Sequence, residues 1–305
     1  MTTTMRPTVA IIGAGRVGSA LGQALYGCGY TLTAVYSRSS GSAHHLADKI
    51  SSRVARSVGD AAAMARLILL TVPDDAIRSV CEELAYSHDL AGRAVVHTSG
   101  VSDMSVLAAA KHRGAWIGGL HPMLAIVDRD LSPELAFAVP GVVFGVEAED
   151  EPLRSWLTTI IRTLKGQALW LHPGEDRAKY HAAAVIASNY MVTLIAEATA
   201  LLQSVDPKGD ERLILQSLVY LVEATLNNIK ERGTTQALTG PIVRGDSGTV
   251  RKHLAALEQA DPQLADMYRL LGLRTLKIAA ERGLDKAKIA EIREDLEKRN
   301  AHDNS

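Results

Sequence analysis

The sequence has little cysteine, few aromatic residues and no excess of charge of either sign. Its 305 residues include 33 Lys and Arg against 34 Asp and Glu, a balance that argues against nucleic acid or an acidic membrane surface as a partner. The two cysteines, Cys28 and Cys81, form neither a Cys-x-x-Cys pair nor a metal-ligand spacing. We therefore expect a reducing compartment, no structural disulfide and no bound metal.

Targeting segments and long apolar runs are also lacking. The N-terminal stretch MTTTMRPTVAIIGAG is too short in its apolar part for a secretory signal, and we find no apolar segment that approaches the roughly 20 residues of a membrane helix. We therefore expect a soluble, cytoplasmic protein. The length, with 47% hydrophobic residues, predicts two domains of ordinary size.

Short apolar runs, many of them β-branched, alternate with helical stretches from Thr8 to Leu171. This alternation predicts βαβ units and an α/β fold with a doubly wound, mostly parallel sheet of Rossmann type. No strand-like run follows Pro173, so we expect a Rossmann-like domain at residues 1–172 and an all-helical domain at residues 173–305. The strand-like runs are TVAII, TLTAVYS, RLILLTV, RAVVHT, WIGGL, GVVFGV and ALWL, and the expected helices are Glu175–Ser204, Glu211–Lys230, Val250–Gln259, Pro262–Ala280 and Lys286–Lys298.

A glycine-rich turn follows the first expected strand and opens the first helix. The order of strand, Gly-x-Gly-x-x-Gly and helix is the dinucleotide-binding fingerprint. In this interpretation Gly13 makes the tight turn, Gly15 lets the backbone approach a pyrophosphate, and Gly18 lets the helix pack on the strand. The candidate pyrophosphate-binding residues are Gly13, Ala14, Gly15, Arg16, Val17 and Gly18.

The end of the second strand indicates which nucleotide is bound. An NAD site usually carries Asp or Glu there, on the ribose hydroxyls, whereas this chain carries Ser37, Arg38 and Ser39. A guanidinium with flanking hydroxyls suits a 2′-phosphate, which a carboxylate would repel. We therefore predict NADP(H) as the cofactor. A solvated surface arginine is the alternative for Arg38.

Chemistry-bearing residues follow three further strands, at the sheet edge where α/β proteins bind ligands. Val72, Pro73 and Asp74 follow one strand and are expected beside the nicotinamide ribose. Ser99 follows the next strand, and His121 ends the one after it. An imidazole at this edge suits a general acid, and Ser99 suits a hydrogen bond to the same substrate oxygen. The alternative is that both residues cap local turns.

The motifs of the chain resemble those of an uncharacterised family in which a Rossmann-like domain precedes a helical domain of unknown function. They are GAGRVGSAL, VPDDAI, HTSG, GLHPM, YHAAAVIASNY and ALTGPIVRGD, and they cover nearly the whole chain. Ser99 with GLHPM also looks like prephenate dehydrogenases and, more distantly, 3-hydroxyacyl-CoA dehydrogenases. The wider resemblance is to the superfamily of 6-phosphogluconate dehydrogenase, ketopantoate reductase and pyrroline-5-carboxylate reductase, and it implies reduction by NADP(H).

Resemblance to ketopantoate reductases implies a second candidate acid, because those enzymes use a lysine on the first helix of the second domain. Lys179 stands in that neighbourhood, with Ala183 where those enzymes carry asparagine. The residue pattern alone favours a solvated lysine in the first helical turn.

Polar residues of the helical half are candidates for substrate binding. His181 and Ser188 are seven positions apart and share one face of the expected long helix, with Asn189 beside them. Arg244, in the Gly- and Pro-bearing turn, is a candidate for gripping a substrate carboxylate with two hydrogen bonds. Helix–helix hydrogen bonds and a structural pairing of Arg244 with Asp246 are the alternatives.

We therefore predict an NADP(H)-dependent reductase of a small carboxylate-bearing oxo or imino compound, acting on a CH–OH or CH–NH group, with His121 as proton donor. One alternative is an NADP(H)-binding redox sensor without turnover, and another is a ketopantoate-type 2-oxo acid reductase that uses Lys179. Because members of the superfamily pair through this domain, the resemblance also implies a homodimer through the apolar helices.

Overall fold

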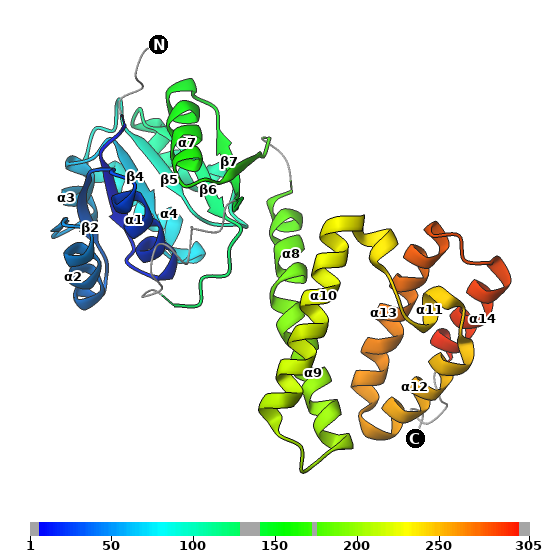
Figure 1. Cartoon of the computed structure of the whole chain (residues 1–305). Helices are drawn as coiled ribbons and strands as arrows, with labels where there is room; N and C mark the ends of the chain where they lie inside the picture. Colours follow the sequence, from blue (N-terminus) through cyan, green and yellow to red (C-terminus); the bar gives the residue numbers. More distant parts are fainter. Residues whose placement is uncertain (1–5, 129–140, 173–175, 299–305) are drawn as a thin grey trace, which may run out of the picture. The chain divides into compact units, whose positions relative to one another are not determined.

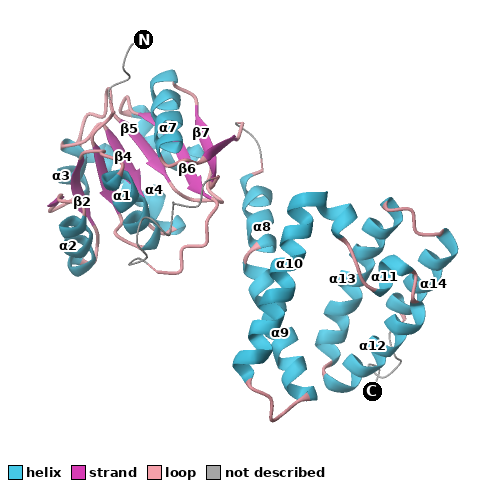
Figure 2. Ribbon diagram, viewed as in Figure 1, coloured by secondary structure: helices cyan, strands magenta, loops and turns pink. Residues whose placement is uncertain are grey.

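The computed structural model describes residues 6–128, 141–172 and 176–298. Its contacts divide the chain into two compact units, one that ends at Asn189 and one that begins at Tyr190 (Figure 1). The predicted domain boundary near Pro173 lies outside the described residues. The first unit contains an α/β sandwich and the second unit is helical, so the predicted fold class is confirmed (Figure 2).

The first unit is built on an eight-stranded sheet in the order β3-β2-β1-β4-β5-β6-β7-β8. Neighbouring strands are parallel except for the antiparallel pair β6 and β7. All seven predicted strands are present, and the two-residue β3 was not predicted. The strands are β1 (Val9–Ile12), β2 (Leu32–Tyr36), β3 (Arg53–Val54), β4 (Leu67–Leu70), β5 (Ala94–His97), β6 (Trp116–Pro122), β7 (Val143–Ala148) and β8 (Gln167–Trp170).

Helices cover both faces of this sheet, because alternate residues of the buried strands point to opposite sides. Ile11 belongs to the core cluster that includes Leu21 of α1, whereas Ile12 belongs to the cluster that includes Leu84 of α4. The helices of this sandwich are α1 (Arg16–Gly27), α2 (Ser40–Lys49), α3 (Val58–Ala63), α4 (Ile77–Ser87), α5 (Ala108–His112) and α7 (Glu151–Thr163).

The strand order indicates where in the sheet a ligand site is expected. The chain leaves β1 toward β2 on one side and reaches β4 on the other, so the order reverses between β1 and β4. A ligand crevice forms outside the carboxyl ends of the strands at such a reversal. Because β4, β5 and β6 run parallel to β1, the residues that follow these strands share that edge.

The long helix expected from Glu175 to Ser204 is divided in the structure. α8 (Arg177–Ala187) ends at Ser188, whose φ and ψ of −115° and −65° interrupt the helix, and α9 (Asn189–Val205) follows. By its contacts α8 belongs to the first unit, although the sequence placed it in the helical domain.

The second unit has a core between its last four helices, whereas α9 and α10 bury almost nothing. The core residues are Ile242, Val250, Leu254, Leu276, Ala279, Ile292 and Leu296. In α9 no residue is buried, and in α10 Ala237 is the single buried one. The helices that follow α9 in the second unit are α10 (Glu211–Ala237), α11 (Pro241–Arg244), α12 (Ser247–Ala260), α13 (Pro262–Glu281) and α14 (Lys286–Glu297).

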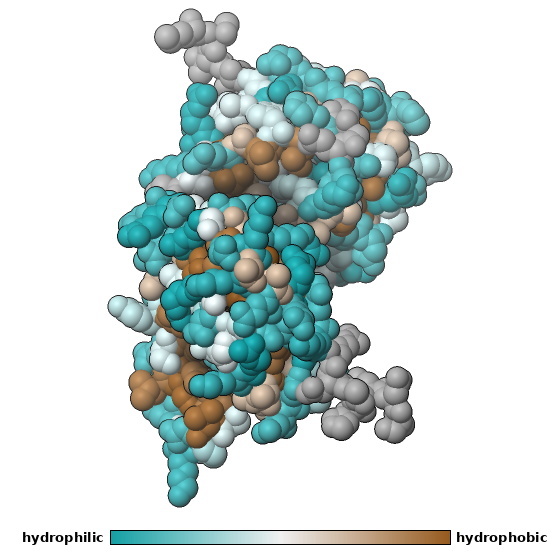
Figure 3. Space-filling view, turned by 90° about the vertical axis from the view of Figure 1, so that its right-hand side faces the viewer, coloured by the Kyte–Doolittle hydropathy of each residue, from teal (hydrophilic) through white to brown (hydrophobic). Residues whose placement is uncertain are grey.

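Apolar side chains are therefore exposed on α9 and α10, and apolar residues gather low on the second unit in the space-filling view (Figure 3). The stretch Arg177–Val205 is also long and apolar enough to cross a membrane by length and composition, contrary to the expectation from the sequence. The exposed large apolar residues of α9 and α10 are Tyr190, Val192, Leu194, Leu202, Val205, Leu213, Leu215, Val219, Tyr220, Leu221, Leu226 and Ile229.

Candidate functional site

The glycine turn after β1 has the geometry of a dinucleotide-binding loop. Gly13 has a φ of +111°, and a Cβ on it would lie 2.6 Å from the carbonyl oxygen of Thr71. A Cβ on Gly18 would collide with the carbonyl oxygen of Gly13. Gly15 faces open space. Two of the three glycines are thus required by packing, and the third leaves the loop accessible to a ligand.

The N-terminus of α1 is free to receive an anion. Its N-cap, Gly15, has no side chain to accept a hydrogen bond, and the first turn, which begins with Arg16 and Val17, holds no acidic residue. The first N–H groups of a helix have no partner within the helix and lie at the positive end of its dipole. A pyrophosphate fits these donors.

Thr71, which follows β4, joins the two strands at the reversal of strand order. Its Oγ1 lies 3.2 Å from the carbonyl oxygen of Ile12 and 2.6 Å from that of Gly13, so the hydroxyl proton is donated to the glycine turn. This residue was not predicted from the sequence. A hydroxyl directly after a fully apolar strand, beside the predicted turn, is the signal that identifies it.

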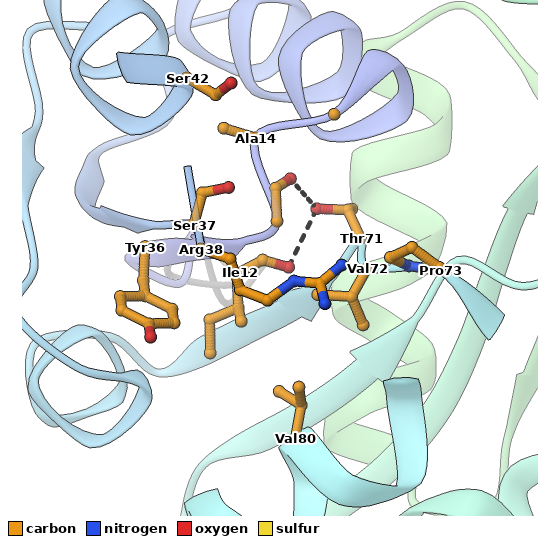
Figure 4. A pocket seen from close by; sticks show the side chains of 12 residues that line it. Ile12, Ala14, Tyr36, Ser37, Arg38, Ser42, Thr71, Val72, Pro73 and Val80 are labelled. Atoms are coloured by element: carbon orange, nitrogen blue, oxygen red, sulfur yellow. Dashed lines mark hydrogen bonds between the residues drawn. The ribbon is translucent and has the colours of Figure 1, made fainter. Parts of the chain in front are cut away.

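These elements surround a cavity of about 240 Å³ in the first unit (Figure 4). Seven of the twelve predicted cofactor residues line it, among them Gly13, Arg38 and Pro73. Of the others, Ser39 is the N-cap of α2 and accepts a hydrogen bond from the backbone of Ser42. The lining residues are Ile12, Gly13, Ala14, Gly15, Tyr36, Ser37, Arg38, Ser42, Thr71, Val72, Pro73 and Val80.

The cavity is lined by a cation and hydroxyls and by no carboxylate. Arg38 lies among its lining side chains with Ser37 and Ser42 (Figure 4). Asp74, the nearest acidic residue along the chain, begins the short 3-10 turn after β4 and is not among the lining residues. This lining suits a nucleotide with an additional phosphate better than a free ribose diol.

A second group of side chains meets at the same sheet edge, beside β5 and β6. His121, in β6, has its Nδ1 2.8 Å from the hydroxyl oxygen of Tyr180, and its ring lies 5.8 Å from that of His181. Gly100, after β5, gives these rings room, since a Cβ there would lie 2.9 Å from Nε2 of His121 and would collide with Nδ1 of His181. The predicted His121 and His181 are therefore neighbours.

The His121 imidazole is neutral at pH 7. Burial, the nearby His181 and the Arg177 guanidinium together lower its pKa to about 4, against the opposing effect of Asp74. A neutral imidazole holds one proton, donates it from one ring nitrogen and accepts a hydrogen bond at the other.

Arg177 fastens α8 to this edge and was not predicted from the sequence. Its side chain is 3% exposed. Nε donates to the carbonyl oxygen of Ser102 at 3.1 Å, Nη2 donates to that of Ser99 at 2.7 Å, and Nη1 lies 3.9 Å from the Glu147 carboxylate. The guanidinium also lies 5.0 Å from the centre of the Tyr180 ring.

Helical spacing brings these side chains to one face of α8. The Asp176 side chain caps the helix by accepting a hydrogen bond from the Lys179 backbone. Arg177, Tyr180 and His181 then follow at positions i, i+3 and i+4, which lie on one side of a helix. This spacing is the signal in the sequence that identifies Arg177 and Tyr180.

Ser99 organises the turn after β5. Its Oγ accepts hydrogen bonds from the backbone N–H groups of Val101 at 3.2 Å and Ser102 at 2.9 Å. The adjacent buried His97 accepts one from the Ser99 backbone at 3.2 Å. The turn-capping alternative thus describes the observed contacts of Ser99, while its hydroxyl proton is still available to donate.

The other predicted substrate and acid residues lie apart from His121. The Lys179 side chain is 85% exposed and pairs with Asp176 at 3.1 Å. Ser188 and Asn189 are exposed at the break between α8 and α9, so the break removes the common helical face predicted for Ser188 and His181.

Arg244 belongs to the second unit, at the end of α11. It is exposed and lines a cavity of about 330 Å³ together with Arg282 and Lys288, whereas Asp285 is the one carboxylate of that lining. The predicted pairing partner, Asp246, caps α12 by accepting hydrogen bonds from the backbone and hydroxyl of Thr249.

Two family models match the chain. The first, described as a Rossmann-like domain, matches residues 2–122. The second, described as a domain of unknown function, DUF2520, matches residues 142–275. Among curated proteins no match is found.

Several solved structures are similar over most of the chain. A Bacteroides fragilis protein provisionally named NADP oxidoreductase is 25% identical with a TM-score of 0.71, over 88% of this chain and 98% of that one. A reductive aminase from Aspergillus terreus in complex with NADPH is 19% identical, with a TM-score of 0.59 over 96% and 93% of the two chains. A pyrroline-5-carboxylate reductase from Coxiella burnetii is 16% identical, with a TM-score of 0.59 over 97% and 100%. The chain thus has a Rossmann-like domain followed by a DUF2520 domain, the two-domain arrangement that its motifs predicted.

Proposed function

We propose that the protein is an NADP(H)-dependent oxidoreductase that reduces a small carboxylate-bearing oxo or imino compound. The observation that carries the proposal is the shared sheet edge: the dinucleotide cavity lies outside β1 and β4, and His121 with His181 lies beside β5 and β6. Neighbouring strands are about 4.8 Å apart, so the two groups are separated by roughly 10 Å. A bound dinucleotide reaches across such a distance.

The choice of NADP(H) rests on Arg38 and on the absence of a carboxylate from the cavity lining. The comparisons agree with this choice, since the Bacteroides fragilis protein is named for NADP and the Aspergillus terreus reductive aminase is a complex with NADPH. The pyrophosphate is assigned to the glycine turn and to the first turn of α1.

His121 is assigned the proton that the reaction adds to the substrate oxygen or nitrogen. The cofactor, when bound, supplies the hydride. His121 holds the substrate atom by a hydrogen bond from its ring N–H, and His181 lies beside it as a second polar contact. Ser99 stabilises the turn after β5, next to His121, by accepting backbone hydrogen bonds.

Arg244 is assigned to the substrate carboxylate. Its cavity holds two more cations, Arg282 and Lys288, and this excess of positive charge suits an anionic group. If the assignment is correct, Arg244→Ala raises the KM for the substrate about tenfold or more and leaves the KM for NADPH unchanged.

We also propose a homodimer through α9 and α10. Twelve large apolar side chains of these two helices are exposed, and exposed apolar surface of this kind is typical of a protein–protein interface. Light scattering on the purified chain is expected to give twice the 32.6 kDa of one chain. A monomer that partitions into lipid vesicles would instead assign this apolar stretch to a membrane.

The decisive experiment follows NADPH oxidation with a panel of 2-oxo acids, 3-oxo acids and cyclic imines. Turnover is expected with one of these classes, and His121→Asn is expected to lower kcat at least 100-fold without changing the Kd for NADPH. His112→Asn, an exposed histidine at the end of α5, is the matched control.

Three other results would replace this proposal. Tight NADPH binding without turnover of any compound would favour a redox sensor. Loss of activity in Lys179→Ala with little change in His121→Asn would favour the ketopantoate-type mechanism. A lower Kd for NADH than for NADPH would contradict the cofactor assignment.

A further inference from the structure

The hydrogen bond between His121 and Tyr180 has a direction that the supply of acceptors around the phenol determines. Nδ1 and the hydroxyl oxygen are 2.8 Å apart, and by themselves either atom is able to donate. The hydroxyl packs over Gly145, the residue paired with His121 across β6 and β7, because a Cβ on Gly145 would collide with the Tyr180 oxygen. Among the described residues, Nδ1 of His121 is the one acceptor within hydrogen-bond distance of the Tyr180 hydroxyl, so the phenol proton has its partner only if Tyr180 donates.

That proton is directed to Nδ1 of His121. The ring is neutral at pH 7, because burial lowers its pKa to about 4, so Nδ1 is able to accept. The single ring proton is then on Nε2. Nε2 lies above Gly100 and makes no hydrogen bond within the part of the chain that the structure describes. The donor nitrogen is therefore the one left for a ligand.

The surroundings of Tyr180 hold its hydroxyl in place. A side chain on Gly145 would occupy the space of the phenol, since a Cβ there would lie 2.6 Å from its Cζ. The Arg177 guanidinium lies 5.0 Å from the ring centre. Burial raises the Tyr180 pKa, whereas the Arg177 charge lowers it, so the guanidinium stabilises a negative charge on the phenol oxygen.

We propose that Tyr180 is the positioning residue of the reduction: it keeps the proton of His121 on Nε2 and gives its own proton to Nδ1 as the Nε2 proton leaves. This inference rests on the proposed reductase function. The N–H bond at Nε2 and the O–H bond of Tyr180 break, while one bond to hydrogen forms on the substrate oxygen or nitrogen and another forms at Nδ1. The imidazole stays neutral throughout, so no imidazolium or imidazolate is required.

The starting state is then restored from water. After product leaves, Nε2 takes a proton from water and Nδ1 returns its proton to the Tyr180 oxygen. Each turnover thus consumes one proton from solvent, as the reduction of a carbonyl or imine by a hydride requires. Tyr180 acts through His121 and does not itself touch the substrate.

Nitrogen NMR of the full-length protein, labelled with ¹⁵N-histidine, tests the tautomer without substrate or cofactor. At pH 7 the His121 signal, assigned by its loss in His121→Asn, is expected to show a protonated Nε2 and an unprotonated Nδ1. Tyr180→Phe is expected to mix the two tautomers, and Tyr86→Phe, an exposed tyrosine of α4, to leave them unchanged. A protonated Nδ1 in the wild type, or an unchanged spectrum in Tyr180→Phe, would overturn the assignment.

Steady-state kinetics test this relay, the transfer of one proton from Tyr180 to Nδ1 as another leaves Nε2. Tyr180→Phe is expected to lower kcat roughly 100-fold with little change in KM. His121 still contacts the substrate in this variant, but Nδ1 no longer receives a proton from Tyr180. Tyr86→Phe should keep wild-type kcat. A fall of less than threefold in Tyr180→Phe would contradict the relay. If no oxo or imino compound is reduced at all, the reductase proposal fails, while the NMR result still decides the tautomer.

Discussion

The candidate site has a glycine end, outside β1 and β4, and a histidine end, beside β5 and β6, and the two ends are built in different ways. The glycine end takes its phosphate-binding backbone from one short stretch, Gly13 to Gly18, and residues that follow β2 and β4 complete its cavity. The histidine end consists of side chains from β5, β6, β7 and α8, which are up to 84 positions apart between His97 and His181. One end binds through local backbone geometry and the other depends on tertiary contacts.

This difference separates the two functions physically. The glycine end needs a turn and a helix N-terminus, both of which form from neighbouring residues. The histidine end exists only while α8 is docked, and Arg177 makes the buried contacts of that docking. A substitution that loosens α8 should therefore impair proton transfer and leave the dinucleotide site intact.

Arg177→Gln should have the largest effect, and it should disrupt the histidine end while the glycine end stays intact. The substitution removes a buried charge from Glu147 and two donors from the carbonyls of Ser99 and Ser102. Losing one partner of a buried ion pair costs about 3 kcal/mol or more. We expect the Tm to fall by about 10 °C, with activity lost and the Kd for NADPH within about twofold of wild type.

The matched control is Arg113→Gln, an exposed arginine that precedes β6 at the opposite edge of the sheet. It should change neither the Tm nor activity. Calorimetry and NADPH titration on both variants check the prediction. If Arg177→Gln weakened NADPH binding as strongly as it lowered activity, the two ends would not be separable.

The histidine end should also make the protein sensitive to acid. Burial, with the Arg177 charge, lowers the His97 pKa to about 4, and the His121 pKa is lowered to about 4 as well. In the unfolded chain a histidine pKa is about 6.5. Between pH 6.5 and 4 the unfolded chain therefore binds more protons, so the free energy of unfolding falls as the pH falls.

Urea unfolding at pH 7 and pH 4.5 measures this contribution. His97→Gln should lose less stability over that interval than the wild type, by about 2 kcal/mol, since one group that protonates on unfolding is gone. His112→Gln, at an exposed position, should keep the wild-type pH dependence. Equal losses in wild type and His97→Gln would show that His97 is not held neutral.

The same division explains what the sequence predicted. Gly13, Gly15 and Arg38 were identified because each owes its role to its own position in a strand–turn–helix pattern. Arg177 and Tyr180 were missed because their roles depend on docking against residues tens of positions away. His121 lies between these cases, since its strand was predictable and its partner was not.

The break of the long helix also could not be predicted from the sequence. The stretch from Arg177 to Val205 contains neither Gly nor Pro, so local propensity favours one continuous helix. The helix is nevertheless interrupted at Ser188, whose φ is −115°. The docking of the α8 side chains is a tertiary constraint, and such constraints override propensity.

Arg38→Ala, at the glycine end, should give the smallest effect of the three substitutions. The guanidinium is assigned to the 2′-phosphate, and an exposed charge-assisted contact of this kind is worth about 1–2 kcal/mol. NADPH binding should therefore weaken about tenfold, while NADH, which lacks that phosphate, should bind as before. Titrations with both nucleotides, with Arg113→Ala as control, measure the difference. An equal loss of affinity for NADPH and NADH would mean that Arg38 supports the loop and does not contact the 2′-phosphate. The NADP(H) assignment would then lack its main supporting residue.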